Sequence, residues 1–96
     1  MTRRPRSLTA IELGARIRAR REALGLSQPK LAERCDVHWT FLGQAERGQR
    51  DIRVHNLLKI AAGLGVDPGE LVKGLKPSQG EEPIYEEEPI EGEGVE

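Results

Sequence analysis

With 96 residues and a single cysteine, Cys35, the sequence allows one small domain and no internal disulfide, and no apolar run is long enough to span a membrane. The formal net charge of −1 conceals a segregation of charge, because residues 1–76 carry 15 basic and eight acidic side chains, whereas residues 77–96 carry eight glutamates and no basic side chain. A net charge of +7 beside one of −8 indicates a body that binds a polyanion, followed by an acidic tail.

Residues 1–8, MTRRPRSL, are basic and contain a proline, and we expect them to form a flexible arm. The arginines of this arm either follow a DNA groove or only keep a disordered chain end soluble: Arg3, Arg4 and Arg6. Thr9 and Glu12 have the spacing of a capping box, which predicts the start of the first helix. Glu12 also interrupts the apolar part of this region, so no export signal is predicted. Gly25 is expected to end the helix.

Arginines occupy most of the surface of this first helix, and we expect them to form a largely solvated face from which some reach phosphate: Arg16, Arg18, Arg20 and Arg21.

The segment from Gln28 to Arg47 has the layout of two short helices joined by a tight turn. Ser27 is a good N-cap for the first of them, and Asp36 is expected to end it. The second helix is predicted over about residues 39–47, with Gly48 as its terminator. The apolar positions predicted to hold this pair to the core are Leu31, Ala32, Cys35, Val37, Leu42 and Ala45.

The rest of the chain continues the helical pattern and then changes composition. Residues 54–64, VHNLLKIAAGL, predict a fourth helix, and its inward side chains are expected to be Leu57, Leu58, Ala61 and Leu64. Asp67 and Glu70 form a second capping box that opens a short fifth helix over residues 68–75. Nothing alternates as a strand would, so residues 9–76 predict an all-α domain of five helices. Residues 77–96 are rich in Pro, Gly and Glu, and disorder is predicted there.

Over about residues 13–75 the chain resembles the lambda-repressor-like, Cro-type helix-turn-helix regulators of the Xre family. The resemblance rests on the strings LGARIRARREALGLSQPKLAERCDV, FLGQAERGQR and LLKIAAGLGVDPGELV, and above all on GLSQ…LA and ERGQR at this spacing. It implies a five-helix domain that inserts its third helix into the DNA major groove, usually as a homodimer on a two-fold operator. The expected function is sequence-specific binding of double-stranded DNA and regulation of transcription, here as a repressor.

The third helix also carries one contiguous, mostly polar stripe at positions i, i+1, i+4, i+5 and i+8: Trp39, Thr40, Gly43, Gln44 and Arg47. With the resemblance, the DNA-binding residues are expected to be Gln28, His38, Trp39, Thr40, Gly43, Gln44, Arg47 and Arg50. In that scheme Gln28 contacts the DNA backbone and buttresses a base-reading side chain, and Gln44 pairs with adenine. Trp39 either presses on a thymine methyl or a sugar, or packs against the second helix or a partner subunit. Glu46 is expected to be structural, and His38 to be a helix cap or a phosphate contact.

Several assignments concern partners. Leu71, Val72 and Leu75 are candidates for a dimer seam, with closure of the monomer core as the alternative. The acidic tail either aids solubility, folds back on the basic body, or docks on a protein partner through residues 81–91. Partner docking gives the alternative function, a protein-interaction module of antitoxin-like or anti-activator type.

The sequence shows no catalytic constellation, and no cofactor or metal site is expected from two isolated histidines, so an enzyme is not predicted. A single cysteine fits a reducing compartment, and we expect a cytoplasmic, nucleoid-associated protein.

Overall fold

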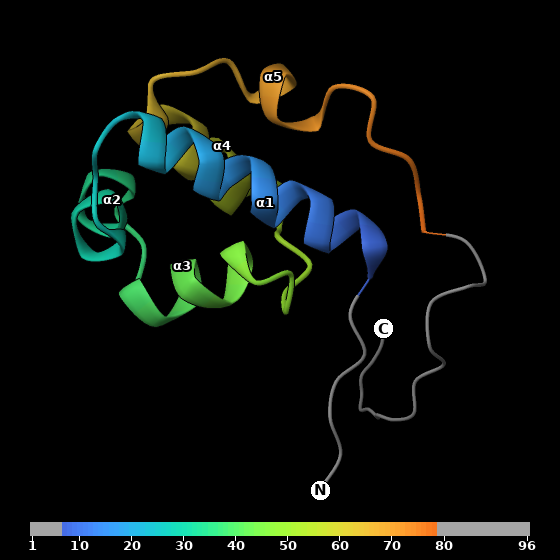
Figure 1. The fold of residues 1–96 in the computed structure, drawn as a ribbon, viewed down its shortest axis with the longest axis horizontal. Coiled ribbons are helices and arrows are strands. Elements are labelled where there is room, and N and C mark those ends of the chain that lie inside the picture. Colours follow the sequence, from blue (N-terminus) through green and yellow to red (C-terminus); the bar gives the residue numbers. More distant parts are fainter. Residues whose placement is uncertain (1–6, 79–96) are drawn as a thin grey trace, which may run out of the picture.

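The computed structural model describes residues 7–78, which fold into five helices with no strand among them. In chain order these are α1 (Leu8–Ala23), α2 (Gln28–Cys35), α3 (Trp39–Glu46), α4 (Val54–Leu64) and α5 (Pro68–Val72). Figure 1 shows α1 running across the molecule, with α3 below it and α5 above it. The predicted all-α, five-helix fold is therefore confirmed. The arginines of the arm and the tail segment 81–91 lie outside the described residues, and their roles stay predictions.

The start of α1 differs from the prediction. Its N-cap is Ser7, whose side-chain oxygen accepts a hydrogen bond from the Ala10 N–H, so the predicted capping box at Thr9 is wrong. Thr9 lies inside the first turn, where its hydroxyl donates to the Lys76 carbonyl and lies 3.1 Å from Ser78 Oγ. Ser78 Oγ also accepts from the Thr9 backbone N–H. The folded unit thus begins before residue 9 and reaches Ser78, beyond the predicted boundary at residue 76.

The residues predicted to end α1 and to begin and end α2 do so in the structure. Gly25 adopts a φ of 72° after α1, and Ser27 caps α2 by accepting from the Lys30 N–H. Asp36 ends α2 in the left-handed conformation with a φ of 57°, which Asp tolerates better than most residues. Lys59 of α4 donates to the Asp36 carbonyl at 2.9 Å, which holds this turn against the bundle.

One large apolar side chain from each helix is fully buried, and together these form the centre of the core: Ile17, Leu31, Leu42, Ile60 and Leu71. Burying a side chain of this size stabilises the fold by roughly 1.5–3 kcal/mol. Five such groups from five helices explain how helices too short to be stable alone hold one another in place.

Two details of α4 and α5 correct the sequence prediction. Leu58 was expected to face inward but is 46% exposed, while Ile60 is fully buried. The inner face of α4 follows Leu57, which packs on the core, and a step of one residue turns Leu58 about 100° away from it. Helix α5 ends at Val72 and not at residue 75, because Lys73 leaves the helical conformation.

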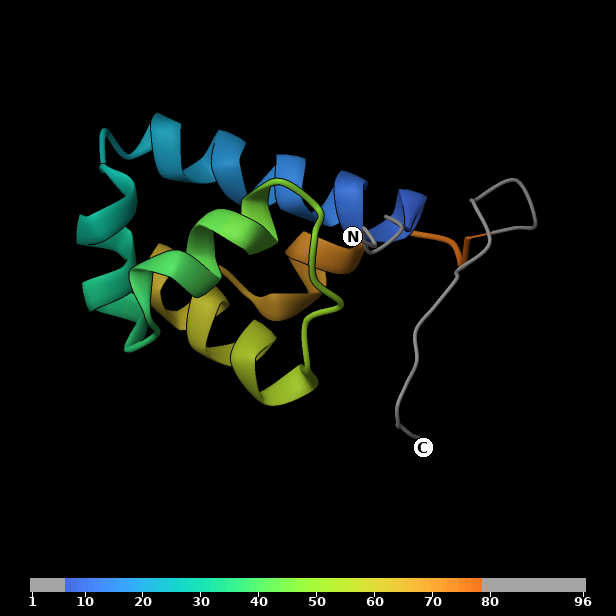
Figure 2. The same ribbon diagram turned by 90° about the horizontal axis from the view of Figure 1, so that it is seen from below.

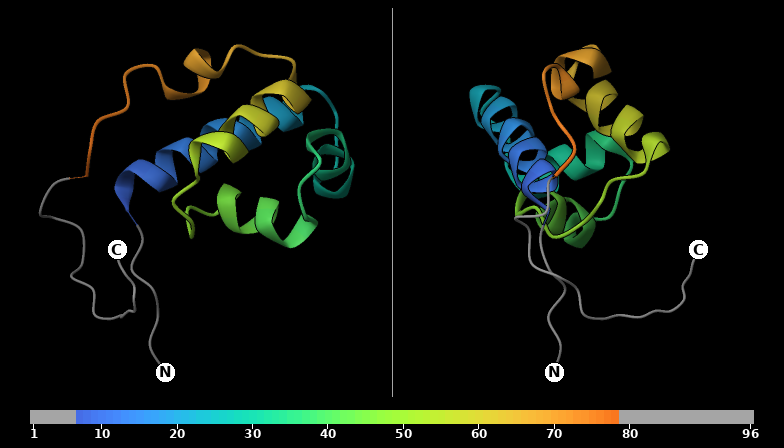
Figure 3. Two further views of the ribbon diagram at one scale, coloured as in Figure 1. Left: turned by 180° about the vertical axis from the view of Figure 1, so that it is seen from behind. Right: turned by 90° about the vertical axis from the view of Figure 1, so that its right-hand side faces the viewer.

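The arrangement leaves one side of α3 uncovered. Seen from below (Figure 2), α3 lies across the face turned to the viewer, with α1 and α4 behind it. The further views (Figure 3) place α5 on the opposite side of the bundle. Among the helices of residues 7–78, none is long and apolar enough to cross a membrane.

Candidate nucleic-acid interface

One face of helix α3 is buried, and the end of the helix packs closely against α1. Leu42 and Ala45 are buried at 0% and 1% exposure. On α1, Gly14 lies so near the end of α3 that a Cβ there would come within 2.3 Å of the Ala45 carbonyl oxygen. The small residue therefore lets the two backbones touch, which fixes α3 relative to the longest helix.

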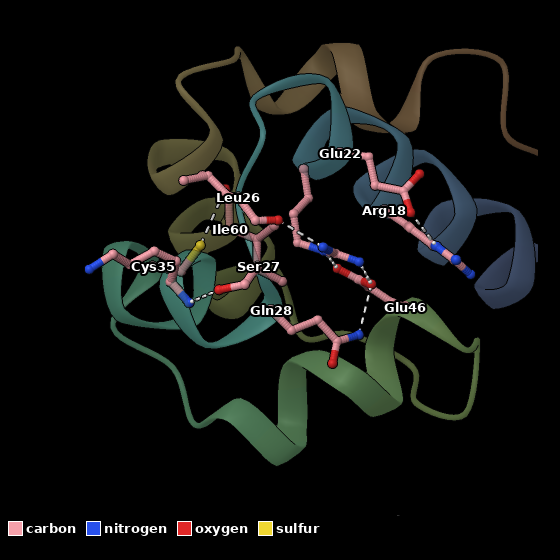
Figure 4. Close-up of polar contacts among 10 residues, drawn as sticks. Arg18, Glu22, Leu26, Ser27, Gln28, Cys35, Glu46 and Ile60 are labelled. Carbon is pink, nitrogen blue, oxygen red and sulfur yellow. Dashed lines mark hydrogen bonds and ion pairs between the residues drawn. The ribbon is translucent and has the colours of Figure 1, made fainter.

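A buried ion pair ties the end of α3 to α1 and α2 (Figure 4). The Glu46 carboxylate accepts from Arg21 Nε at 2.7 Å and from Arg21 Nη2 at 3.0 Å, a bidentate arrangement. Arg21 also donates to the Leu26 carbonyl at 2.8 Å. The hydrogen bond to Glu46 raises the pKa of Arg21 above its ordinary value, against the opposing effect of burial. Glu46 is thus a structural residue, as predicted.

Gln28, at the start of α2, completes this network. Its amide nitrogen donates to Glu46 Oε1 at 2.9 Å, and Figure 4 shows the side chain reaching across to the end of α3. The nitrogen end of the Gln28 amide therefore supports Glu46, while its Oε1 lies over Gly43 on the α3 face, and the predicted buttress of a base-reading side chain stays a prediction. A phosphate contact by Gln28 stays a prediction.

The uncovered face of α3 surrounds a shallow hollow of about 270 Å³ beside the start of α2. Its lining is Gln28, Trp39, Thr40, Gly43 and Arg47, five of the eight residues predicted to meet DNA. Trp39 is 57% exposed, so it is not packed into the core of its own protomer. Gly43 is buried beneath the side chains of Gln28 and Arg47 and forms the floor of the hollow.

The remaining predicted contacts lie at the two ends of α3. His38 is the N-cap, and its Nδ1 accepts from the Thr40 N–H at 3.1 Å, which confirms the expected cap. Beyond the other end, Arg50 donates to the Gln44 side chain at 2.8 Å and lies over the Phe41 ring at 5.6 Å from its centroid. Phe41 itself packs against the core, as predicted.

The electrostatics of this face favour an anion. Glu46 is the one carboxylate of α3, and it is buried and paired with Arg21. Arg47 and Arg50 are exposed, and neither forms an ion pair with a carboxylate among residues 7–78. By contrast, the arginines of α1 contact their own chain. Arg16 donates to the carbonyls of Leu71 and Lys73. The other three form ion pairs with glutamates: Arg18, Arg20 and Arg21. The side chains of Arg18 and Arg20 nevertheless remain 63% and 42% exposed, so this face is partly solvated as expected, and its phosphate contacts stay a prediction.

The candidate dimer seam is only partly supported by exposure. Leu71 has no exposed surface, so its assignment to the seam is wrong and it closes the monomer core. Val72 is 37% exposed and Leu75 is half-buried. Sequence reasoning missed two exposed apolar side chains on α4, Val54 at 71% and Leu58 at 46%. They stand four residues apart, hence on one side of the helix.

The other reactive groups belong to the fold. Cys35 is 2% exposed, and burial raises the pKa of its thiol to about 11. It is a small core residue, as predicted. Within residues 7–78 no group of three or more His, Cys, Asp or Glu side chains is placed to hold a metal ion.

A bundle of five short helices with a braced helix-turn-helix and an uncovered face on its second helix defines a lambda-repressor-like DNA-binding domain. The sequence profile described as "Helix-turn-helix" matches residues 17–71, more than half of the chain. The chain belongs to this helix-turn-helix family, and within it to the Cro-type (Xre) regulators.

Restriction–modification control proteins are prominent among its relatives. Control protein C.BamHI of Bacillus amyloliquefaciens is 45% identical over 47 residues, which span 49% of this chain and 58% of that protein. Control protein C.SmaI of Serratia marcescens is 34% identical over 70 residues, 71% of this chain and 83% of that protein. The crystal structure of the restriction–modification controller protein C.AhdI from Aeromonas hydrophila superposes with a TM-score of 0.64 at 40% identity, over 65% of this chain and 94% of that one.

Proposed function

We propose that this chain regulates transcription, as a repressor, by binding a two-fold operator in double-stranded DNA as a homodimer, and that it controls a restriction–modification system. The observation that carries the proposal is the exposed face of α3 around the hollow next to the start of α2. Helix-turn-helix proteins place that face in the major groove, with half-sites about one helical turn apart. The relatives described as control proteins support the regulatory assignment.

Each residue of the face has a distinct role in this proposal. The exposed indole of Trp39 contacts a thymine methyl or a sugar, and its N–H donates to a phosphate or a base acceptor. Thr40 donates to a base edge or phosphate. Arg47 and Arg50 neutralise phosphates, so affinity falls steeply as salt rises. The backbone N–H of Gln28 at the start of α2 offers a further phosphate site, since Pro29 has no N–H and the Lys30 N–H is bonded to Ser27.

The homodimer is proposed to form through apolar side chains on α4, on α5 and just beyond the end of α5. Val72 and Leu75 remain from the predicted seam, and Val54 and Leu58 extend it onto α4. A contiguous apolar patch on a small domain marks an interaction site, and we propose that these side chains form one. A DNA-binding regulator of this type acts in the cytoplasm on the nucleoid, and we propose that location.

The test is a selection of bound sequences from a random double-stranded DNA library, run with residues 1–96 and with residues 1–78. The shorter chain ends at Ser78 because that residue bonds to α1. One palindromic motif from both chains supports the proposal. A motif from the shorter chain alone identifies the tail as an inhibitor. No enrichment from either chain refutes the proposal and favours the interaction-module alternative through residues 81–91.

Trp39→Ala gives a second test of the same face. We expect weaker and less selective binding of the selected operator, measured by fluorescence anisotropy. Because the side chain is 57% exposed, its removal leaves the core intact. Wild-type affinity and selectivity in this variant would show that Trp39 has no part in recognition.

A further inference from the structure

Among the described residues, the contact between Gln44 and Arg50 is the one hydrogen bond that joins the side chains of two predicted DNA contacts. Arg50 Nε lies 2.8 Å from Gln44 Oε1. The backbone reinforces the approach, because the Gln49 N–H donates to the Gln44 carbonyl at 2.9 Å and so brings the loop back to the end of α3. The guanidinium rests over the ring of Phe41, at 5.6 Å from the centroid.

The chemistry of the two groups fixes the orientation of the amide. A guanidinium has only donors, so the amide atom that faces Arg50 must be the carbonyl oxygen. A hydrogen bond from a charged donor is roughly twice as strong as one between neutral groups. The ring of Phe41, which packs against the core, gives the guanidinium a fixed surface. Rotation of the Gln44 amide by 180° would place its NH₂ group against the donors of Arg50, and this arrangement is excluded.

We propose that Arg50 is a positioning residue for sequence reading: it holds Gln44 in one rotamer and one amide orientation, ready to read a base. This inference rests on the proposed function. Arg50 occupies one of the two lone pairs of Gln44 Oε1, which leaves the other lone pair and both N–H donors free. One acceptor beside one donor is the complement of the adenine edge in the major groove. Arg50 thereby supplies a support of the kind that the family resemblance gave to Gln28, whose amide nitrogen is bonded to Glu46 in this chain.

If Arg50 only neutralised phosphate and did not position Gln44, a different outcome would follow. A phosphate contact contributes affinity on every sequence and one unit of salt dependence, without preference for a base. A positioning role contributes preference at a single base pair. Ordering one long side chain costs about 0.5–1.5 kcal/mol, which converts to a roughly two- to tenfold effect on that preference.

The experiment compares four full-length proteins in the library selection: wild type, Gln44→Ala, Arg50→Met and Arg47→Met. Gln44→Ala identifies the base pair that Gln44 reads, as the position at which preference is lost. We expect Arg50→Met to lower the preference at that position about two- to tenfold, while the other positions keep theirs. Arg47→Met is the matched control, because Arg47 has the same charge but donates to Gln49 and not to Gln44. It should weaken binding on all sequences alike.

The double variant with both Gln44→Ala and Arg50→Met should lose no further preference at that base pair. A second measurement needs no DNA: the side-chain amide NMR signals of Gln44 in the free protein should shift in Arg50→Met and stay in place in Arg47→Met.

Three results would contradict the inference. If Arg50→Met behaves as Arg47→Met does, with a uniform loss of affinity and an unchanged preference, Arg50 is a phosphate contact only. If Gln44→Ala keeps every preference, Gln44 reads no base. If the Gln44 amide signals do not respond to Arg50→Met, the contact is absent in solution. Failure of the proposed function has a separate signature, because the wild-type protein would then select no sequence at all.

Discussion

Removing the buried carboxylate of Glu46 should destabilise the domain more than any loss of a surface charge. The side chain of Glu46 is 2% exposed and that of Arg21 is 12% exposed. Breaking a buried ion pair by deleting one partner typically costs about 3–5 kcal/mol, because the other charge stays buried without compensation. A domain of this size has a total stability of about 4–11 kcal/mol at roughly 0.05–0.15 kcal/mol per residue. Glu46→Ala should therefore remove a large part of the stability.

The two single variants should differ in a defined order. Arg21→Ala leaves the more deeply buried carboxylate with only the amide of Gln28, so we expect the larger loss there. Glu46→Ala leaves an arginine that still donates to the Leu26 carbonyl and is partly exposed. The double variant should lose less than the sum of the two, because neither charge is then left unpaired.

Urea unfolding followed by far-ultraviolet circular dichroism measures these losses. Tryptophan fluorescence is a poor probe here, because Trp39 is already 57% exposed in the folded state. The control is Glu22→Ala, which breaks the exposed pair with Arg18 and should cost about 0.5 kcal/mol or less. If Glu46→Ala unfolds at the same urea concentration as Glu22→Ala, the carboxylate is not the brace of α3 and the reasoning is wrong.

Three further results are expected. Gly14→Ala should lower the free energy of unfolding by about 1–3 kcal/mol or more, because the new methyl would lie 2.3 Å from the Ala45 carbonyl oxygen. Gly43→Ala should lower it less, because the nearest neighbour of its methyl is the flexible end of Arg47 at 3.3 Å. Thermal unfolding measures both losses. Because the folded pKa of Cys35 is raised to about 11, the native state keeps a proton that the unfolded chain releases near pH ~8.5. Stability should thus fall between pH ~8.5 and about 11 by roughly 3–4 kcal/mol at ~1.4 kcal/mol per pH unit, and Cys35→Ala should remove that slope in urea titrations. Leu58→Glu should shift the sedimentation-equilibrium mass from dimer to monomer while leaving the far-ultraviolet spectrum intact, and an unchanged dimer would place the seam elsewhere.

Local chemistry explains why the sequence predicted most helix ends. Ser27, Asp36 and Gly25 act through contacts with residues a few positions away, so their roles are visible in the sequence. The start of α1 was missed because Thr9 is used by a long-range contact, to Lys76 and Ser78, which no local pattern reveals. Ser7, two residues earlier, serves as the cap, and its hydroxyl also lies 2.9 Å from Ser78 Oγ.

The site was predictable as a set of positions but not as a set of contacts. Periodicity and family resemblance placed Trp39, Thr40 and Arg47 on one face, and the structure gathers them around the hollow. Neither source could show that Gln28 is bonded to Glu46, or that Arg50 returns to Gln44. Both contacts depend on how a loop and a helix start are oriented in three dimensions, and a one-dimensional pattern carries no such information.

Recognition and stability are separable on α3, although both depend on the same eight residues. A helix of that length is not stable alone in water, so its readable face exists only while its other face is buried and Glu46 is paired. Substitutions in the brace therefore act on DNA binding by lowering the fraction of folded protein, which affects every sequence equally. Loss of Arg50 removes no core contact and leaves the fold in place, so it should change which base is preferred. A variant that alters base preference at unchanged unfolding midpoint would thus locate its effect at the Gln44–Arg50 contact and not in the packing of the domain.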